Sequence, residues 1–374
     1  MKNFNSKGFC LIFIILLPGV FIDCSNFSNK NFIEKQHEIE LIAYYAGDTK
    51  SIDEYDLSGV TQLIYSFLHL KGNELSIDNK SDSLTLIHLS ALKNNYPKLK
   101  VLVSLGGWGG CKSCSSVFSS EKGRKEFAKS TARIIEQYNA DGIDLDWEYP
   151  VVPGPPGHPY SSQDKDNFTA LIKELKAVMH PDDILSFAAG GFPSYLEKSI
   201  DWNAVMPLVD HVNIMSYDLY GGYSKFTGHH TPLYSNADQQ SLSADQAVKY
   251  LIDIGIPANK IVIGAAFYGR IWKKVPDLNN GLYQPGVFYK SLGYNNWDQL
   301  DSGYEFYRDQ VAKAPYAYNK EKSYFFTFDD SISVIHKTKY AKENGLKGIM
   351  FWQLMNDKAQ NGLLSHMVRA AKPE

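Results

Sequence analysis

A column of acidic residues marks the segment 141–150, DGIDLDWEYP. Asp144, Asp146 and Glu148 stand at alternate positions, with a large apolar residue in each gap. Successive side chains of a β-strand point to opposite faces, so the three carboxyl groups share one face at spacings of about 6.6–6.8 Å. Carboxyl groups buried this close together repel one another and lose hydration, which raises at least one pKa. A raised carboxyl pKa is what a general acid near neutral pH requires.

Two other roles for these acids, a charged segment on a solvated surface and a metal site, agree less well with the sequence than proton transfer does. A charge run on a solvated face would not alternate with residues as large and apolar as Ile143, Leu145 and Trp147. A metal site is disfavoured because three carboxylates on one strand are collinear and cannot wrap around an ion. No His stands among them either. We therefore expect proton chemistry here and no metal.

The elements that position these acids form a regular alternation. Near-continuous apolar runs, typical of parallel strands covered on both faces, lie near residues 40, 61, 100, 141, 184, 211, 260 and 348. Amphipathic segments lie between them, the clearest at 121–139, 164–179 and 243–255. In the last, Ser243 is the expected N-cap and Gly255 the C-terminal stop.

Eight strand–helix units of this kind predict an α/β fold, the (β/α)8 TIM barrel. In such a barrel the acids point inward, and Glu148 lies nearest the C-terminal mouth, before Pro150 ends the strand. A doubly wound open sheet is the alternative. It usually needs fewer strands and a glycine-rich phosphate loop after the first strand, and AYYAG at 43–47 is not such a loop.

One interval breaks the alternation between the seventh and eighth predicted strands. It is far longer than one crossover helix needs, and residues 273–325 are rich in Tyr, Asn and Gly. This segment predicts a small α+β lobe inserted on the loop side of the barrel, where barrel enzymes build their sites.

Five motifs together resemble glycoside hydrolase family 18, the chitinases and their relatives. DGIDLDWE is similar to the family's DxxDxDxE signature, and the other four are SLGG at 104–107, MSYD at 215–218, FYGR at 267–270 and FWQL at 351–354. The resemblance spans about 39–370 and includes the subgroup with an inserted α+β lobe. It implies a (β/α)8 barrel and substrate-assisted retention, in which the N-acetyl group of the sugar forms an oxazolinium ion.

The resemblance also implies roles for the acids. Glu148 protonates the leaving oxygen and later activates water, and Asp146 orients the acetamide. Asp144 lies deeper and shares or relays a proton with Asp146. Tyr217 holds the acetamide oxygen. Two carboxyl groups within hydrogen-bond distance should titrate as a coupled pair.

Further positions match the family's sugar-binding groove or its supports. We expect Ser104 to donate a hydrogen bond to Asp144, and Asp141 to be structural, capping backbone N–H groups. The expected substrate-binding residues, several of them aromatic and suited to stacking on pyranose rings, are Tyr44, Phe67, Trp108, Met215, Asp218, Tyr268, Arg270 and Trp352.

The N-terminal segment 1–24 has the features of an export signal. A basic start precedes an apolar run at 9–22 that is short for a transmembrane span. Cys24 follows, as in bacterial lipoprotein signals, although Asp23 departs from that pattern. The sequence is consistent with two outcomes: lipidation of Cys24, which would anchor the protein at the cell surface, or cleavage of the signal at another bond. A polar linker at 25–38 follows, then the catalytic domain at 39–374.

Two pairs of neighbouring residues resemble metal ligands but favour structural roles. Cys111 and Cys114 form CKSC, which has no second Cys pair to complete a zinc site, and in an exported chain a disulfide is expected. His229 and His230 are adjacent, a spacing that rarely holds one ion, so hydrogen-bonding roles are expected.

Three functions, two of them hydrolytic and one a binding function, are consistent with the sequence. The first is a secreted chitinase that acts as a monomer on chitin or chitooligosaccharides without a cofactor. The second is an endo-β-N-acetylglucosaminidase acting on glycoprotein glycans. The third is a lectin that binds chitooligosaccharides without cleaving them. The net charge of −3, with no long run of one sign, excludes nucleic acid as an expected partner.

Overall fold

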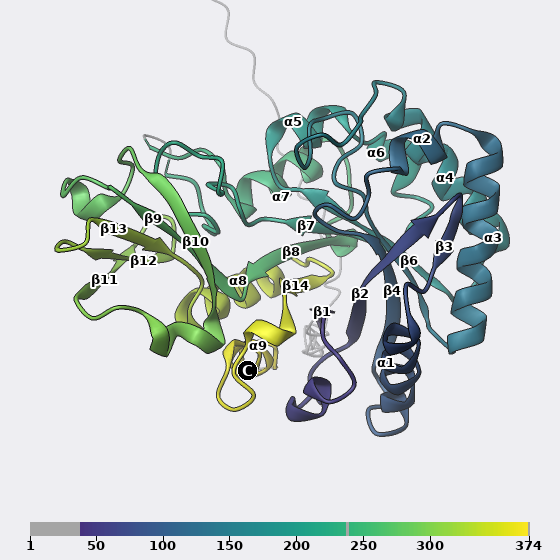
Figure 1. The fold of residues 1–374 in the computed structure, drawn as a ribbon, viewed down its shortest axis with the longest axis horizontal. Helices are drawn as coiled ribbons and strands as arrows, with labels where there is room; N and C mark the ends of the chain where they lie inside the picture. Colours follow the sequence, from purple (N-terminus) through teal and green to yellow (C-terminus); the bar gives the residue numbers. More distant parts are fainter. Residues whose placement is uncertain (1–37, 237–238, 373–374) are drawn as a thin grey trace, which may run out of the picture. The chain divides into compact units, whose positions relative to one another are not determined.

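A closed barrel of parallel strands forms the larger part of the computed structural model, which describes residues 38–236 and 239–372. The strand order is β1-β14-β8-β7-β6-β5-β4-β2, and pairing of β1 with β2 closes the ring (Figure 1). The eight strands, all at positions predicted from the apolar runs, are β1 (Glu40–Tyr45), β2 (Gln62–Lys71), β4 (Lys100–Gly106), β5 (Gly142–Asp146), β6 (Ile184–Gly190), β7 (His211–Met215), β8 (Ile261–Ala266) and β14 (Gly348–Trp352).

Helices cover the outside of the barrel and explain the apolar runs. The side chains of Ile143, Leu145 and Trp147 belong to the large core between strands and helices, opposite the acids of the same strand. Ser243 caps its helix as predicted, accepting a hydrogen bond from Gln246 N. The main helices are α1 (Lys80–Ala91), α3 (Glu121–Tyr138), α4 (Asp164–Val178), α5 (Pro193–Lys198), α7 (Ala244–Asp253), α8 (Ser331–Glu343) and α9 (Leu363–Ala371).

Three short elements complete the barrel. They are β3 (Glu74–Ser76), which pairs antiparallel with β2, α2 (Cys114–Phe118) and α6 (Trp202–Val205).

The insertion between β8 and β14 is a five-stranded antiparallel sheet, drawn at the left of Figure 1. Its order is β10-β9-β13-β12-β11, from β9 (Tyr268–Lys273), β10 (Val287–Gly293), β11 (Tyr304–Asp309), β12 (Ala314–Asn319) and β13 (Tyr324–Thr327). The α+β lobe predicted at about 273–325 lies within this inserted segment. The sheet starts at Tyr268, and its connections as described contain only 3-10 turns, η4 (Asn279–Gly281) and η5 (Tyr294–Gln299).

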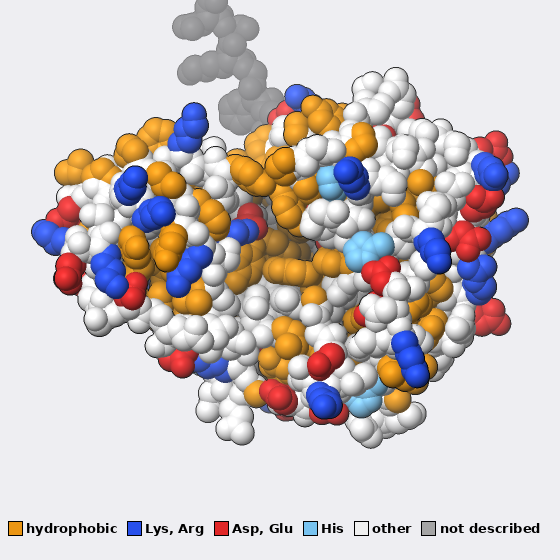
Figure 2. All heavy atoms as spheres, in the orientation of Figure 1, with side chains coloured by type: hydrophobic (Ala, Val, Ile, Leu, Met, Phe, Trp, Pro, Cys, Tyr) orange, Lys and Arg blue, Asp and Glu red, His pale blue; other side chains and the backbone are white. Residues whose placement is uncertain are grey.

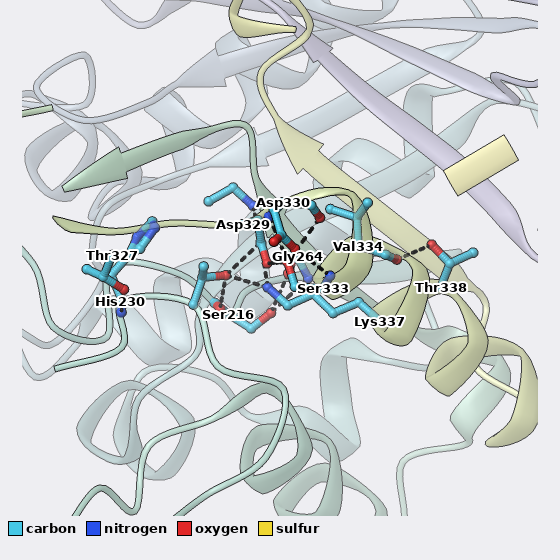
Figure 3. Close-up of polar contacts among 12 residues, drawn as sticks. Ser216, His230, Gly264, Thr327, Asp329, Asp330, Ser333, Val334, Lys337 and Thr338 are labelled. Carbon is cyan, nitrogen blue, oxygen red and sulfur yellow. Dashed lines mark hydrogen bonds and ion pairs between the residues drawn. The ribbon is translucent and has the colours of Figure 1, made fainter. Parts of the chain in front are cut away.

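A buried ion pair fastens the stem of this lobe to the barrel (Figure 3). Asp329, just after the lobe, accepts hydrogen bonds from Lys337 Nζ at 2.6 Å and from Ala266 N, at the end of β8, at 2.9 Å. Thr231 Oγ1 and Ser333 Oγ donate to the same carboxylate at 3.1 and 2.6 Å. The two ends of the insertion are thus held together at one carboxylate.

The export signal at 1–24 and most of the linker lie outside the described residues. Within the described part of the chain, no helix combines the length and the apolarity that crossing a membrane would demand.

Candidate active site

Asp144 lies inside the barrel and is completely buried. Its Oδ2 accepts hydrogen bonds from Tyr44 Oη at 2.9 Å and Ser104 Oγ at 3.4 Å, and its Oδ1 accepts from Ser186 Oγ at 2.6 Å and Asn213 Nδ2 at 3.0 Å. Burial raises the pKa of Asp144 even though these four hydrogen bonds favour the ionised form. The predicted bond from Ser104 is present.

Asp146 lies above Asp144 on the same face of β5, and its Oδ1 is buried without a hydrogen-bond partner among the described residues. Burial, followed by the charges of Glu148 and Asp144, raises the pKa of Asp146 well above its usual range. The predicted proton sharing between Asp144 and Asp146 is not seen as a hydrogen bond. Alternate strand positions are about 6.6–6.8 Å apart, and the oxygens of Asp144 are already engaged.

Glu148 stands at the mouth of the barrel, two residues past the end of β5 at Asp146 rather than within a strand extending to Pro150. Its exposed fraction is 7%. Burial raises the pKa of Glu148 to about 7, and the charge of Asp218 adds to this. A carboxyl group that keeps its proton near neutral pH can serve as a general acid.

Tyr217 follows β7 and reaches across the barrel, with its Oη 3.7 Å from Met350 Sδ. The ring lies against Gly264 of β8, where an added Cβ would come within 2.7 Å of Tyr217 Cε1. Glycine at 264 therefore makes room for the tyrosine. No motif in the sequence marked this position.

Asp218 is held by a cluster of polar side chains on the lobe side. Arg270 donates to both of its oxygens, Nε at 2.7 Å and Nη2 at 2.5 Å, and Tyr268 Oη donates at 2.9 Å. His230 Nδ1 lies 3.5 Å from Asp218 Oδ1. Burial would raise the pKa of Asp218, but the hydrogen bonds and charges of His230 and Arg270 outweigh it and lower that pKa. Asp218 therefore stays ionised, with its charge neutralised by Arg270.

A groove of about 940 Å³ connects these groups, and Figure 2 shows hydrophobic side chains around the hollow near the centre of this face. Three aromatic rings line its inner part. Phe67 and Trp352 are stacked, with their ring centroids 5.4 Å apart, and the ring of Tyr44 lies beside Trp352. Trp108 is half exposed at its rim. All eight predicted substrate-binding residues line this groove, together with Asp146, Glu148 and Tyr217.

Several lining residues were not predicted from the sequence. Tyr149, Phe192 and Tyr223 come from loops after barrel strands, Phe288 and Ser291 from the lobe, and Asn356 from the segment after β14. Ser291 Oγ accepts a hydrogen bond from Arg270 at 2.7 Å. The only available signal was their position after the predicted strands, which does not tell which loop residues face inward.

The supporting residues agree with their predicted structural roles. Asp141 accepts a hydrogen bond from Val101 N at 2.8 Å and pairs with Lys93 and Lys100 at 3.0 and 3.1 Å. Cys111 and Cys114 form a disulfide in the loop that carries Trp108.

The two adjacent histidines face different partners. His229 Nε2 lies 3.1 Å from Asp309 Oδ2, whereas His230 faces Asp218. Among the described residues, no group of three or more His, Cys, Asp or Glu side chains is arranged to hold a metal ion.

Comparison with known proteins identifies the class that this barrel and groove define. Residues 40–357 match glycosyl hydrolases family 18, and the chain belongs to this family. It is 34% identical over 311 residues to chitinase A1 of Niallia circulans, covering 76% of this chain but only 44% of that relative. It is 29% identical over 339 residues to chitotriosidase-1 of Mus musculus, covering 85% of this chain and 70% of that one.

A solved structure agrees with the fold. The family 18 N-acetylglucosaminidase of Paenibacillus barengoltzii superposes with a TM-score of 0.80 at 32% identity, covering 89% of this chain and 99% of that chain.

Proposed function

We propose that this glycoside hydrolase is a chitinase that cleaves β-1,4-linked N-acetylglucosamine chains with retention of configuration, using the acetamide of the substrate as nucleophile. The observation that carries the proposal is the arrangement of acids in the groove. The lining acids are Asp146, Glu148 and Asp218, and Asp218 is engaged by Arg270. Asp146 is not engaged in this way, but it lies two residues before Glu148 in the same segment and so does not flank a bound sugar from the opposite side. Among the described lining acids none faces Glu148 as a separate nucleophile, so the substrate has to supply one.

The chemistry follows from the protonation states. Glu148 gives its proton to the glycosidic oxygen as the bond to the anomeric carbon breaks, and the acetamide oxygen forms a bond to that carbon. Asp146, next to the acetamide, accepts a hydrogen bond from its N–H and stabilises the positive oxazolinium. Glu148, now ionised, takes a proton from water, which attacks the anomeric carbon and releases the acetamide. The acid is regenerated at the end of the cycle.

The aromatic groove supports a saccharide substrate. The stacked pair Phe67–Trp352 offers a flat apolar surface for the C–H face of a pyranose. Tyr217 has its hydroxyl in the inner part of the groove, where an acetamide oxygen can accept a hydrogen bond from it. Asp144 and its four donors hold the base of the column, which keeps Asp146 in a dry and fixed environment.

Proton NMR of fresh product tests this proposal. Native protein incubated with a chitin hexasaccharide should release initial β-anomer, and Glu148→Gln should release almost none. Initial α-anomer would contradict retention. Binding without cleavage by native protein would favour the lectin alternative, and neither binding nor cleavage would redirect the search to glycoprotein glycans.

A second candidate is an N-acetylglucosaminidase. It is favoured by the similarity to the Paenibacillus barengoltzii enzyme, which carries that name. The same reaction separates the two, because release of monosaccharide alone from the hexasaccharide supports this candidate, whereas disaccharide and longer products support a chitinase.

Export of the chain is part of the proposal and rests on the N-terminal sequence pattern. Mass spectrometry of the mature N-terminus tests it. Acylated Cys24 would indicate a lipid-anchored protein at the cell surface, a free terminus after the apolar run would indicate secretion, and retention of Met1 would contradict export. Sedimentation of the mature protein tests the expected monomer.

A further inference from the structure

Glu148 stands beyond the part of the sheet that carries the other two acids of the column. Pairing of β5 with β4 ends at Asp146, and pairing of β5 with β6 ends at Leu145. The ladder of the barrel therefore does not fix the place of Glu148. A general acid has to lie within hydrogen-bond reach of the oxygen that it protonates, so the segment after Glu148 has to hold it there.

The chain turns back on itself directly after Glu148. Val152 N donates a hydrogen bond to Pro150 O at 2.8 Å, which closes a three-residue γ-turn with Val151 at its centre. The φ of Val151 is +69°, which makes this the rare and strained form of the γ-turn. A β-branched residue avoids positive φ because its Cβ crowds the neighbouring backbone. Such a conformation persists only where the surrounding structure holds it, and it is typical of active sites.

Contacts on both sides of Val151 hold the turn closed. Ser199, which is fully buried and directly follows α5, donates from its Oγ to the same Pro150 O at 2.7 Å. Val152 is 5% exposed and packs in the core between strands and helices. None of these residues is among those described as lining the groove. They therefore hold the turn from behind, without contact to a bound sugar.

The turn brings the chain back against the acid. Gly154 lies so close to Glu148 that an added Cβ would come within 2.3 Å of Glu148 O. On the other side, the ring of Tyr149 packs edge-on against Tyr195 of α5, with the ring centroids 5.5 Å apart. Helix α5 and the turn thus place Glu148 where the sheet no longer does.

We propose that Ser199 and Val151 are positioning residues for Glu148, which together keep its carboxyl group at the mouth of the barrel in the place where proton transfer occurs. The step of proton transfer rests on the proposed function, whereas the placement of Glu148 does not. Opening the turn displaces Glu148 and admits water to it. Hydration lowers the pKa of a buried carboxyl group toward its usual value, so both the position and the titration of Glu148 report on the turn.

Titration of Glu148 by carboxyl-carbon NMR tests its placement, whether or not the protein cleaves chitin. Glu148→Gln identifies the signal by its loss. Val151→Pro forces φ to about −65°, which this turn cannot accommodate, whereas Val151→Gly permits the positive φ and is the matched control. The midpoint of Glu148 is about 7 in native protein. It should fall by about half a pH unit or more in Val151→Pro and stay unchanged in Val151→Gly.

Kinetics on a chitin hexasaccharide test the consequence for proton transfer. Ser199→Ala should lower kcat by about tenfold or more and leave KM nearly unchanged, because the acid is displaced while the groove is intact. The alkaline limb of its pH profile should move to lower pH. Ser130→Ala is the matched control, since Ser130 is also buried and donates to Phe127 O at 2.7 Å, but on α3. It should leave kcat and the pH profile unchanged.

A native-like midpoint or a native-like kcat in Val151→Pro and Ser199→Ala would overturn the inference. Equal changes in Val151→Pro and Val151→Gly, or in Ser199→Ala and Ser130→Ala, would also overturn it. If native protein cleaves no chitin but the midpoint falls in Val151→Pro, the placement of Glu148 stands and the proposed function fails. If Ser199→Ala does not fold, the comparison of Val151→Pro with Val151→Gly decides, because Val151 is only half-buried.

Discussion

This protein buries carboxyl groups at two places, one with a cationic partner and one without. At the stem of the lobe, Asp329 and Lys337 have exposed fractions of 0 and 1%, and the anion is matched by a cation. Inside the barrel, Asp144, Asp146 and Glu148 are nearly as inaccessible, and none of their described hydrogen bonds or ion pairs involves a Lys or Arg.

The difference between the clusters lies in what replaces water. Asp329 receives a cation, two hydroxyl groups and a backbone N–H. Asp146 receives no donor on Oδ1 from the described residues, and burial together with its acidic neighbours raises its pKa. A paired carboxylate fixes the fold, whereas an unpaired one keeps a proton available for chemistry.

The largest effect is expected at the top of the acid column. Glu148→Gln keeps the shape of the side chain but cannot transfer a proton, so kcat on a chitin hexasaccharide should fall by about 10²–10⁴-fold. Glu197→Gln makes the same exchange at an exposed residue of α5 and should leave kcat unchanged. A Glu148→Gln enzyme with nearly native kcat would show that Glu148 is not the acid.

The next largest effect is expected at the paired cluster, on stability. Lys337→Met leaves Asp329 buried and unpaired, which should lower the free energy of unfolding in urea by about 3–5 kcal/mol. Lys249→Met breaks the ion pair between an exposed lysine and Asp245, which keeps its hydrogen bond from Tyr340, and should cost less than about 1 kcal/mol.

A double variant sharpens this result. Asp329→Asn combined with Lys337→Met removes both charges and keeps an acceptor for Ala266 N, so it should recover more than half of the loss. A Lys337→Met loss no larger than that of Lys249→Met, or no recovery in the double variant, would mean that the pair does not stabilise the lobe stem.

The acid column should show itself in the pH dependence of stability. The pKa of Glu148 rises from 4.5 to about 7 on folding, so folding retains a proton that the unfolded chain releases. The stabilisation that Glu148 gains from its raised pKa is fully present below pH 4.5 and is lost as the pH rises toward 7. Relative to Glu148→Gln, native protein should lose about 1.4 kcal/mol per pH unit in this window. Equal stability changes in the two proteins across this window would contradict the raised pKa.

The smallest effect is expected at the base of the column. Ser104→Ala removes the long 3.4 Å bond to Asp144 and should change the free energy of unfolding by less than about 1 kcal/mol. Ser186→Ala removes a 2.6 Å bond to the same carboxylate and should cost more, both in stability and in kcat/KM. The reverse order would show that bond length does not rank the donors of Asp144.

The acid column was predictable because a strand alternates its faces. One window of ten residues contains Asp144, Asp146 and Glu148, and the apolar residues between them indicate a buried strand. The lobe was harder to predict, because the FYGR motif follows β8 without a break and hid the start of a second sheet at Tyr268. In addition, a composition rich in Tyr, Asn and Gly does not distinguish short 3-10 turns from α-helices in the connections.

The sequence by itself determined the barrel, the column of acids and those aromatic residues of the groove that lie in or beside its motifs, because each depends on a local period or on a motif within a few residues. The tertiary structure alone decided which buried charges are paired. Lys337 meets Thr231 across 106 residues of chain, and Gly264 admits Tyr217 from the neighbouring strand. Such contacts depend on how distant strands pack, which no local pattern specifies.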